Sequence, residues 1–306
     1  MAQPLLALVG PTASGKTSAA LTIAERLGAE IVSIDSMLVY RGMDVGTAKP
    51  TAEERARVPH HLIDVASPTQ RFTVARFRDL AGEALAGIAD RGNRALLVGG
   101  SGLYFRAVVD ELEFPAEDHG IRGDLEREAA VVGARALHGR LAAIDPAAAS
   151  KIEPANARRT VRALEVAAIT GRPFSSFASA WARYPATRVR AAGAHMRSDV
   201  LAARIEARVR AMLERGFLAE VRSLIARGFG GWLTASQAIG YAEMVDYLEG
   251  RMILADAVAR TEKRTRALAR RQKAWFRRDP RIVWFDTGSE GAPALVDEIV
   301  AYLGGV

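Results

Sequence analysis

The segment Gly10–Thr17 reads GPTASGKT and matches the pattern G-x-x-x-x-G-K-[ST] at every position. It directly follows the apolar run Leu5–Val9 and directly precedes a helical pattern over residues 18–27. Small residues at such a turn allow backbone N–H groups to converge on phosphate oxygens, and the positive end of the helix dipole faces the same point. The motif therefore predicts a strand, a phosphate-binding turn and a helix in direct succession.

All residues of this turn are candidates for binding a phosphate or diphosphate group: Gly10, Pro11, Thr12, Ala13, Ser14, Gly15, Lys16 and Thr17. Lys16 is expected to neutralise phosphate charge, and the Thr17 hydroxyl to bind Mg²⁺, which takes substrate phosphate oxygens as further ligands. The turn does not identify the reaction. Phosphoryl transfer, nucleotide-driven switching and transfer of a group attached to a diphosphate all remain open.

Short apolar or β-branched runs alternate with helical patterns along the chain. The expected strands are 5–9, 31–34, 62–65, 95–98, 187–194 and 282–285. The expected helices are 18–27, 74–89, 199–215, 218–227, 235–249 and 255–277. This alternation predicts an α/β fold, a P-loop NTPase-like parallel sheet flanked by helices.

Residues from about 113 to 185 depart from this alternation. They are rich in Ala and Arg and have helical spacing without a clear strand. We therefore expect an all-helical insertion domain over 113–185, and a P-loop catalytic core made of residues 1–112 and 186–306. The chain has 306 residues, which is long for one domain and agrees with such an insertion.

Nearly all of the excess positive charge lies in one segment. The chain has a formal net charge of +7, and Val258–Arg281 alone contains ten Lys/Arg and two acidic residues, a net charge of +8, so the remainder sums to −1. Such a segment is typical of a face that binds nucleic acid or phosphate. A helix whose charges are merely solvated is the alternative. Arg266 and Arg270 are candidate nucleic-acid contacts in this segment.

The chain contains no cysteine, which excludes disulfides, thiol nucleophiles and zinc ribbons. The N-terminal residues lack the basic lead and apolar stretch of a secretory signal, and no apolar run approaches the roughly 20 residues that span a bilayer. We therefore expect a cytoplasmic protein without a membrane partner.

Asp35 follows the second expected strand, at the edge of the sheet where α/β proteins bind ligands. Such a carboxylate can serve as a general base or face a metal ion; the alternative is that it caps the following turn. Two nearby loops are also candidates for function: the polar loop 40–50, which carries Arg41 and Lys49, and the glycine-rich segment 99–104.

Taken in order, these motifs resemble those of one family, the tRNA dimethylallyltransferases in their bacterial form. The resemblance extends along the chain through GPTASGKT (10–17), SIDS (33–36), GMDVGTAKP (42–50), HHLID (60–64), GGSGLY (99–104), RALEV (162–166), QAIGY (237–241) and RQKAWF (271–276). It implies transfer of a dimethylallyl group from its diphosphate to N6 of the adenine 3′ to the anticodon. Small departures are Ser101 in place of Thr, Ala157 and Arg158 in place of Pro and Gln, and Arg270 in place of Lys.

The resemblance also implies roles for individual residues. Thr12 to Thr17 would hold dimethylallyl diphosphate, with Mg²⁺ as cofactor, and Asp35 would be the base. Arg204 and Arg208 would help to hold the leaving diphosphate, and which of the two does so stays open. The residues expected to meet the extruded adenine or the surrounding tRNA are Asp35, Ser36, Met37, Leu38, Ser101, Arg122, Arg158, Arg159, Thr160, Val161 and Arg162.

Three other functions compete with this interpretation: a small-molecule P-loop kinase, an adenylate prenyltransferase and a non-enzymatic RNA-binding switch. The first two have no evident use for the strongly basic segment. Of Tyr104, Trp275 and Phe276, which could stack on bases, we expect two to pack in the core. A monomer is expected.

Overall fold

The computed structural model describes residues 4–110, 112, 114–177, 183–232 and 234–305. The chain forms two compact units: a core unit of residues 1–110 and 186–306, and an insertion unit of residues 111–185. Among the described helices, none is long and apolar enough to cross a membrane.

The core unit is built on a six-stranded sheet in the order β3-β2-β4-β1-β5-β6. Its strands are β1 (Leu5–Val9), β2 (Ala29–Ser33), β3 (His60–His61), β4 (Arg94–Gly99), β5 (Val189–His195) and β6 (Ile282–Asp286). Every pairing is parallel, which confirms the predicted fold class. The carboxyl ends of all the strands therefore meet at one edge of the sheet, where α/β proteins bind ligands.

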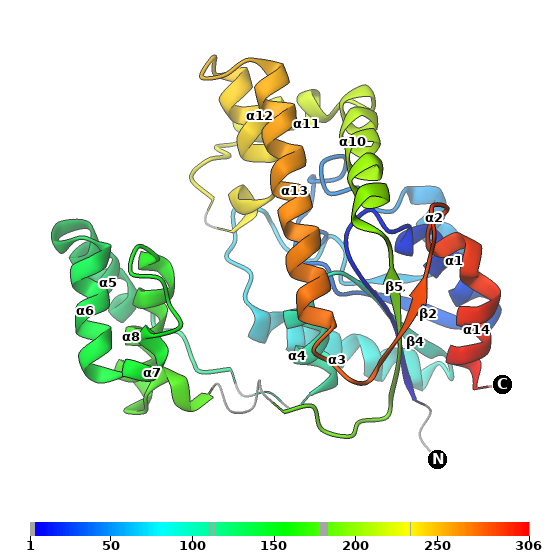
Figure 1. Cartoon of the computed structure of the whole chain (residues 1–306), viewed down its shortest axis with the longest axis horizontal. Helices are drawn as coiled ribbons and strands as arrows, with labels where there is room; N and C mark the ends of the chain where they lie inside the picture. Colours follow the sequence, from blue (N-terminus) through cyan, green and yellow to red (C-terminus); the bar gives the residue numbers. More distant parts are fainter. Residues whose placement is uncertain (1–3, 111, 113, 178–182, 233, 306) are drawn as a thin grey trace. The chain divides into compact units, whose positions relative to one another are not determined.

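Alternating side chains of β1 point to the two faces of the sheet. Leu6 and Leu8 join the core on one face, and Ala7 and Val9 join the core on the other. The first face is covered by α1 (Lys16–Leu27) and α14 (Val296–Gly304), and the second by α3 (Val74–Asp90) and α4 (Gly102–Val109) (Figure 1). Burial on both faces explains why β1 is apolar at every position.

One expected strand, 62–65, is wrong. The strand β3 ends at His61, and the following Leu62 and Asp64 have φ angles of 62° and 59°, which are incompatible with an extended run. The buried Lys49 amine explains the bend, because it donates hydrogen bonds of 2.5 Å to the Asp64 carboxylate and 2.8 Å to the Tyr40 carbonyl. The apolar residues here fill the core without forming a strand.

A set of helices packs together beside the sheet: α10 (Ser198–Glu214), α11 (Phe217–Ile225), α12 (Tyr241–Leu248) and the basic helix α13 (Leu254–Phe276). The expected helix 235–249 is interrupted. It consists of a 3₁₀ turn, Ala235–Gln237, and α12, because Gly240 has a φ of 96° and its N–H is capped by the Glu243 carboxylate. Shorter helical segments of the core unit are α2 (Ala52–Arg57) and a 3₁₀ turn, Ala292–Leu295.

The described part of the insertion unit is helical. It contains α5 (His119–Val132), α6 (Ala134–Ile144), α7 (Pro146–Ala149), α8 (Ala157–Thr170) and a 3₁₀ turn, Phe174–Phe177. These helices share a core of their own, centred on Leu137, Leu141 and Leu164. The unit therefore has the internal packing of a separate domain.

Candidate active site

The phosphate-binding turn, Gly10–Thr17, joins the interior strand β1 to α1 at the carboxyl edge of the sheet. Two of its glycines are required by packing. A Cβ on Gly10 would lie 2.8 Å from the Ala194 carbonyl oxygen, and a Cβ on Gly15 would lie 2.9 Å from Pro293. Both glycines also have positive φ angles, 147° and 83°, which residues with a Cβ rarely adopt. Close packing and backbone conformation together therefore require glycine at both positions of the turn.

Lys16 is the buried cation of this turn. Its amine donates a 2.5 Å hydrogen bond to the Pro11 carbonyl. Burial, and then the positive charge of Arg208, lower the pKa of the amine to about 7. The neighbouring Thr17 is exposed and lines the adjacent cavity, so its hydroxyl is accessible to an ion or a ligand.

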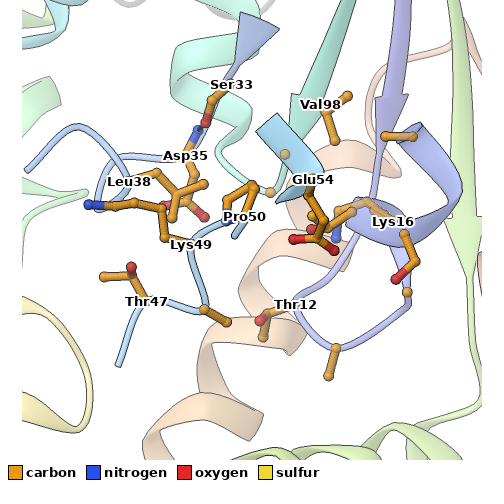
Figure 2. Close-up of a pocket in the computed structure, with 18 of the residues that line it drawn as sticks. Thr12, Lys16, Ser33, Asp35, Leu38, Thr47, Lys49, Pro50, Glu54 and Val98 are labelled. Atoms are coloured by element: carbon orange, nitrogen blue, oxygen red, sulfur yellow. Dashed lines mark hydrogen bonds between the residues drawn. The ribbon is translucent and has the colours of Figure 1, made fainter. Parts of the chain in front are cut away.

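A phosphate-side cavity of about 540 Å³ opens beside the turn. Its basic lining residues are Lys16, Lys49, Arg204, Arg208 and Arg215, and its acidic ones are Asp35 and Glu54, so the lining has a net positive charge that favours an anion. Figure 2 shows Lys16 and Thr12 of the turn around this cavity together with Asp35 and Thr47. The cavity has the size and the charge to hold an organic diphosphate.

A second, helix-side cavity of about 490 Å³ lies between the sheet edge and the helices α10 and α13. Ser36, Met37 and Ser101 line it from the sheet edge. The helices contribute Ile205, Val209, Met212, Leu268, Arg264 and Arg271. The Ser101 hydroxyl also caps α4 by accepting a 3.3 Å hydrogen bond from the N–H of Tyr104. Apolar side chains with basic groups form a surface suited to an aromatic base with its phosphates.

Six residues line both cavities: Thr12, Asp35, Thr47, Gly100, Arg208 and Gln272. A group held beside the phosphate-binding turn can therefore approach a group that enters from the helix side. Leu38, which was expected near the base, lines the phosphate-side cavity instead.

Asp35 caps a turn and also lines both cavities. Its Oδ1 accepts a 2.8 Å hydrogen bond from the N–H of Met37, which is the expected turn cap. The same side chain also lines both cavities, where a carboxylate can accept a proton. Capping fixes the orientation of the carboxylate without consuming all of its acceptor sites.

The structure separates the environments of Arg204 and Arg208. The Arg204 Nε donates a 2.9 Å hydrogen bond to the Ala13 carbonyl, and its Nη1 donates to the carbonyls of residues 289–290, so this guanidinium fastens the turn to the segment before α14. The Arg208 guanidinium donates to Thr12 Oγ1 at 3.2 Å and to the Thr47 carbonyl at 3.3 Å. Arg208 is therefore the arginine exposed to both cavities.

Gln272 and Thr47 line both cavities but were not expected as individual site residues, although Thr47 lies in the loop 40–50 that was expected to be functional. The Gln272 Oε1 accepts a 2.8 Å hydrogen bond from the N–H of Thr12 across 260 positions, and its amide lies so close to Gly100 that a Cβ there would be 2.3 Å away. Two signals were available for Gln272: it is an uncharged polar residue inside a basic helix, and it belongs to the RQKAWF motif of the family resemblance. Its partner could be identified only after α13 had been packed against the turn.

The positive charges of α13 and the residues after it fall into two groups. Arg264 pairs with Glu243, and Arg266 lies 3.1 Å from Glu206. The cations without a carboxylate within 4.0 Å among the described residues are Lys263, Arg270, Arg271, Lys273, Arg277 and Arg278. This second group is available to an external polyanion.

Of the three aromatic residues considered for stacking, two pack in the core, as predicted. Tyr104 and Phe276 are 6% and 1% exposed, whereas Trp275 is 40% exposed. The Trp275 ring covers Gly102, where a Cβ would lie 1.8 Å from the ring.

The insertion-unit residues implied by resemblance differ in exposure. The Arg122 side chain is buried and binds the fully buried Glu165, to which Arg162 also donates at 2.9 Å. Residues 160–161 are buried, and residues 158–159 are exposed. Within this unit, the arginines at 158–159 are therefore the better placed for an external contact.

The parallel sheet, the phosphate-binding turn and the two adjoining cavities define an α/β P-loop enzyme that acts on a phosphorylated substrate. The chain belongs to the IPP transferase family: the family model described as IPP transferase matches residues 38–279, and one described as isopentenyl transferase matches residues 3–70.

Individual relatives agree with this assignment. The tRNA dimethylallyltransferase of Nocardioides sp. is 48% identical over 298 residues, which cover 97% of this chain and 95% of that protein. The solved tRNA isopentenylpyrophosphate transferase of Bacillus halodurans is 42% identical, with a TM-score of 0.72 and coverage of 99% of this chain and 96% of that one. A solved eukaryotic dimethylallyltransferase, 24% identical with a TM-score of 0.77, covers 93% of this chain and 74% of that one and shares the fold.

Proposed function

We propose that this protein transfers a dimethylallyl group from dimethylallyl diphosphate to N6 of the adenine 3′ to the anticodon of tRNA, releasing diphosphate. The main observation in support of this proposal is that the two cavities share six lining residues, among them Asp35 and Arg208. This shared wall brings a cationic phosphate site and a cavity beside the basic helix together at Asp35. The family to which the chain belongs supports the same reaction.

In the transfer step, the adenine N6 attacks the allylic carbon and the bond from that carbon to the diphosphate oxygen breaks. N6 becomes positively charged as the new C–N bond forms, and Asp35 accepts its proton. The electron pair of the broken bond leaves with the diphosphate. The base must be extruded from the anticodon loop to reach Asp35, at a cost of a few kcal/mol that contacts to the rest of the RNA offset.

The leaving diphosphate gains negative charge, and the phosphate-side cavity stabilises it. We assign this task to Lys16, Arg208 and the backbone N–H groups of the turn, because these donors line the cavity and Arg208, unlike Arg204, also lines the helix-side cavity. Arg204 would act indirectly, by holding the turn through the Ala13 carbonyl.

Mg²⁺ is the proposed cofactor, held by the Thr17 hydroxyl and by oxygens of the diphosphate. When bound, it would supply Lewis-acid stabilisation of the leaving group. The described residues contain no group of three or more His, Asp or Glu side chains that could enclose an ion. This fits Mg²⁺, which commonly keeps several waters and takes substrate oxygens as ligands.

The tRNA would lie along the unpaired cations of α13 and contact the exposed residues 158–159 of the insertion unit. Because both cavities are lined by a single chain, we expect the enzyme to act as a monomer. A tRNA substrate would place this activity in the cytoplasm.

The test combines the protein with dimethylallyl diphosphate, Mg²⁺ and either unmodified tRNA or AMP, and measures prenyl transfer by mass spectrometry. We expect modified tRNA and unmodified AMP. Asp35→Asn keeps the oxygen that caps Met37 but removes the base, so turnover should fall by about 100-fold or more while tRNA binding persists. Asp90→Asn, at an exposed carboxylate of α3, is the matched control and should be fully active.

Each alternative has its own outcome in the same assay. Prenylated AMP would indicate an adenylate prenyltransferase, and phosphate transfer from ATP would indicate a kinase. Binding of RNA without any product would indicate an RNA-binding switch. Loss of tRNA binding in Asp35→Asn, with turnover per bound complex unchanged, would reassign Asp35 to a structural role.

A further inference from the structure

The carboxylate of Glu220, on α11, accepts four hydrogen bonds. Its Oε2 accepts from the backbone N–H groups of Asp44 at 2.8 Å and Val45 at 2.7 Å. Its Oε1 accepts from the N–H of Gly46 at 3.1 Å and from the Tyr241 hydroxyl at 2.7 Å. Glu220 has no ion pair among the described residues, so its charge is directed at three successive amides of one loop and a phenol. Hydrogen bonds to a charged acceptor are the stronger class.

This loop has little freedom to adopt another conformation. A Cβ on Gly46 would lie 2.2 Å from the Phe217 ring and 2.6 Å from the Tyr241 ring, so the glycine is pressed against both aromatic residues. The Thr47 hydroxyl donates a 2.6 Å hydrogen bond to the Met43 carbonyl and closes the loop on itself. Burial, and then the nearby Glu220, raise the pKa of Tyr241, so its phenol stays a neutral donor.

The loop ends at the shared wall of the two cavities. The Thr47 carbonyl accepts a 3.3 Å hydrogen bond from Arg208 Nη2, while Arg208 Nη1 donates to Thr12 Oγ1 at 3.2 Å. The guanidinium is thus held between the loop on one side and the phosphate-binding turn on the other. If the Thr47 carbonyl were displaced, the Arg208 guanidinium would be held by only one of these two hydrogen bonds, the one to Thr12 Oγ1.

We propose that Glu220 is a positioning residue for the transfer reaction: its carboxylate fixes residues 44–47, which in turn hold the Arg208 guanidinium at the diphosphate. This inference rests on the proposed function. Glu220 lines neither cavity, so it acts through Arg208 without contacting the substrate.

The experiment compares Glu220→Gln with the wild-type protein. The amide group replaces one acceptor oxygen by a donor that faces backbone N–H groups. Since a hydrogen bond to a charged group contributes about 1.5–3 kcal/mol, we expect kcat/KM for dimethylallyl diphosphate to fall about 10- to 100-fold. The affinity for inorganic pyrophosphate, measured by calorimetry, should fall as well, while tRNA affinity should stay within about twofold because Glu220 lies outside the basic helix.

A double-mutant cycle with Arg208→Ala separates positioning from general destabilisation. If Glu220 acts through Arg208, Glu220→Gln should have little further effect on kcat/KM once the guanidinium is gone. Glu214→Gln, at an exposed carboxylate of α10, is the matched control and should resemble the wild type. Tyr241→Phe removes only the hydrogen bond from the phenol to Glu220 and should reduce kcat/KM by a smaller factor. This variant replaces Glu220→Gln in the experiment if Glu220→Gln does not fold.

Additive effects of Glu220→Gln and Arg208→Ala would overturn the proposal, as would wild-type pyrophosphate affinity in folded Glu220→Gln. A variant whose only change is a lower melting temperature, with normal kcat per active site, would show a purely structural role. Failure of the proposed function can be told apart from failure of this inference. If the proposed function is wrong, the wild-type protein makes no prenylated tRNA, but its affinity for pyrophosphate still shows whether Glu220 positions Arg208.

Discussion

The Lys16 amine is about half neutral near pH 7 in the ligand-free protein, because burial and the charge of Arg208 lower its pKa to about 7. A bound diphosphate favours the protonated amine, so binding above pH 7 takes up a proton. The same shift makes the free energy of unfolding rise with pH between about 7 and 10.5, since the unfolded chain binds a proton that the folded chain has lost.

We therefore predict that affinity for inorganic pyrophosphate, measured by calorimetry in EDTA, weakens by up to about tenfold per pH unit above pH 7. Lys16→Arg, whose guanidinium does not titrate in this range, should retain only the dependence that pyrophosphate itself produces. Identical pH profiles for the two proteins would show that the amine is already protonated throughout.

At the scale of elements, the position of a cation on α13 decides whether it is available to RNA. The sequence pattern makes Arg266 and Arg270 equal candidates for RNA contacts, but Arg266 lies beside Glu206, whereas Arg270 is exposed without a carboxylate partner among the described residues. An arginine that is already paired with a carboxylate neutralises a phosphate less fully, so its contact displaces fewer counterions from the RNA. The unpaired cations should dominate the electrostatic contribution.

Neutralising Arg270, Arg277 and Arg278 together should weaken tRNA binding and reduce the slope of log K against log salt by about 0.7–0.9 per lost phosphate contact. A filter-binding titration at several salt concentrations measures both. The control with the same charge change neutralises Arg26, Arg57 and Arg251, which are cations outside α13 that are already paired with carboxylates, and should leave the slope nearly unchanged. If the two triple variants gave equal slopes of log K against log salt, the charges of α13 would be merely solvated and would not contact the tRNA.

At the scale of the whole molecule, the two units have separate hydrophobic cores. Leu141 is fully buried in the core of the insertion unit, and Leu8, on strand β1, is fully buried in the core between the sheet and α1. Chains with two compact units commonly depart from a single two-state transition.

We predict that Leu141→Ala lowers the stability of the insertion unit by about 2 to 5 kcal/mol and leaves pyrophosphate affinity unchanged. Scanning calorimetry should show one transition moving to lower temperature while the other stays in place, and Leu8→Ala should move the other one. A single transition that shifts equally in both variants would show that the units unfold together.

Structural features that depend on residues close together in the sequence were predictable, whereas those that depend on residues far apart were not. The phosphate-binding turn and five of the six strands were predictable, because a contiguous motif and a two-sided apolar pattern determine them locally. The strand expected at 62–65 was wrong because Lys49 binds Asp64 from another loop. The helix expected at 235–249 was too long because Gly240 must take a positive φ beside Phe217.

The sequence by itself determined the α/β class, the phosphate-binding turn, the placement of Asp35 at the sheet edge and the concentration of positive charge in one helix. Each of these follows from neighbouring residues or from a simple periodicity. Only the tertiary structure decided that Gln272 reaches Thr12, that Glu220 supports the loop behind Arg208 and that Arg266 is already paired. Those partners lie 60 or more positions apart, and side chains at such separations meet only when whole helices pack against one another, the sheet and the loops.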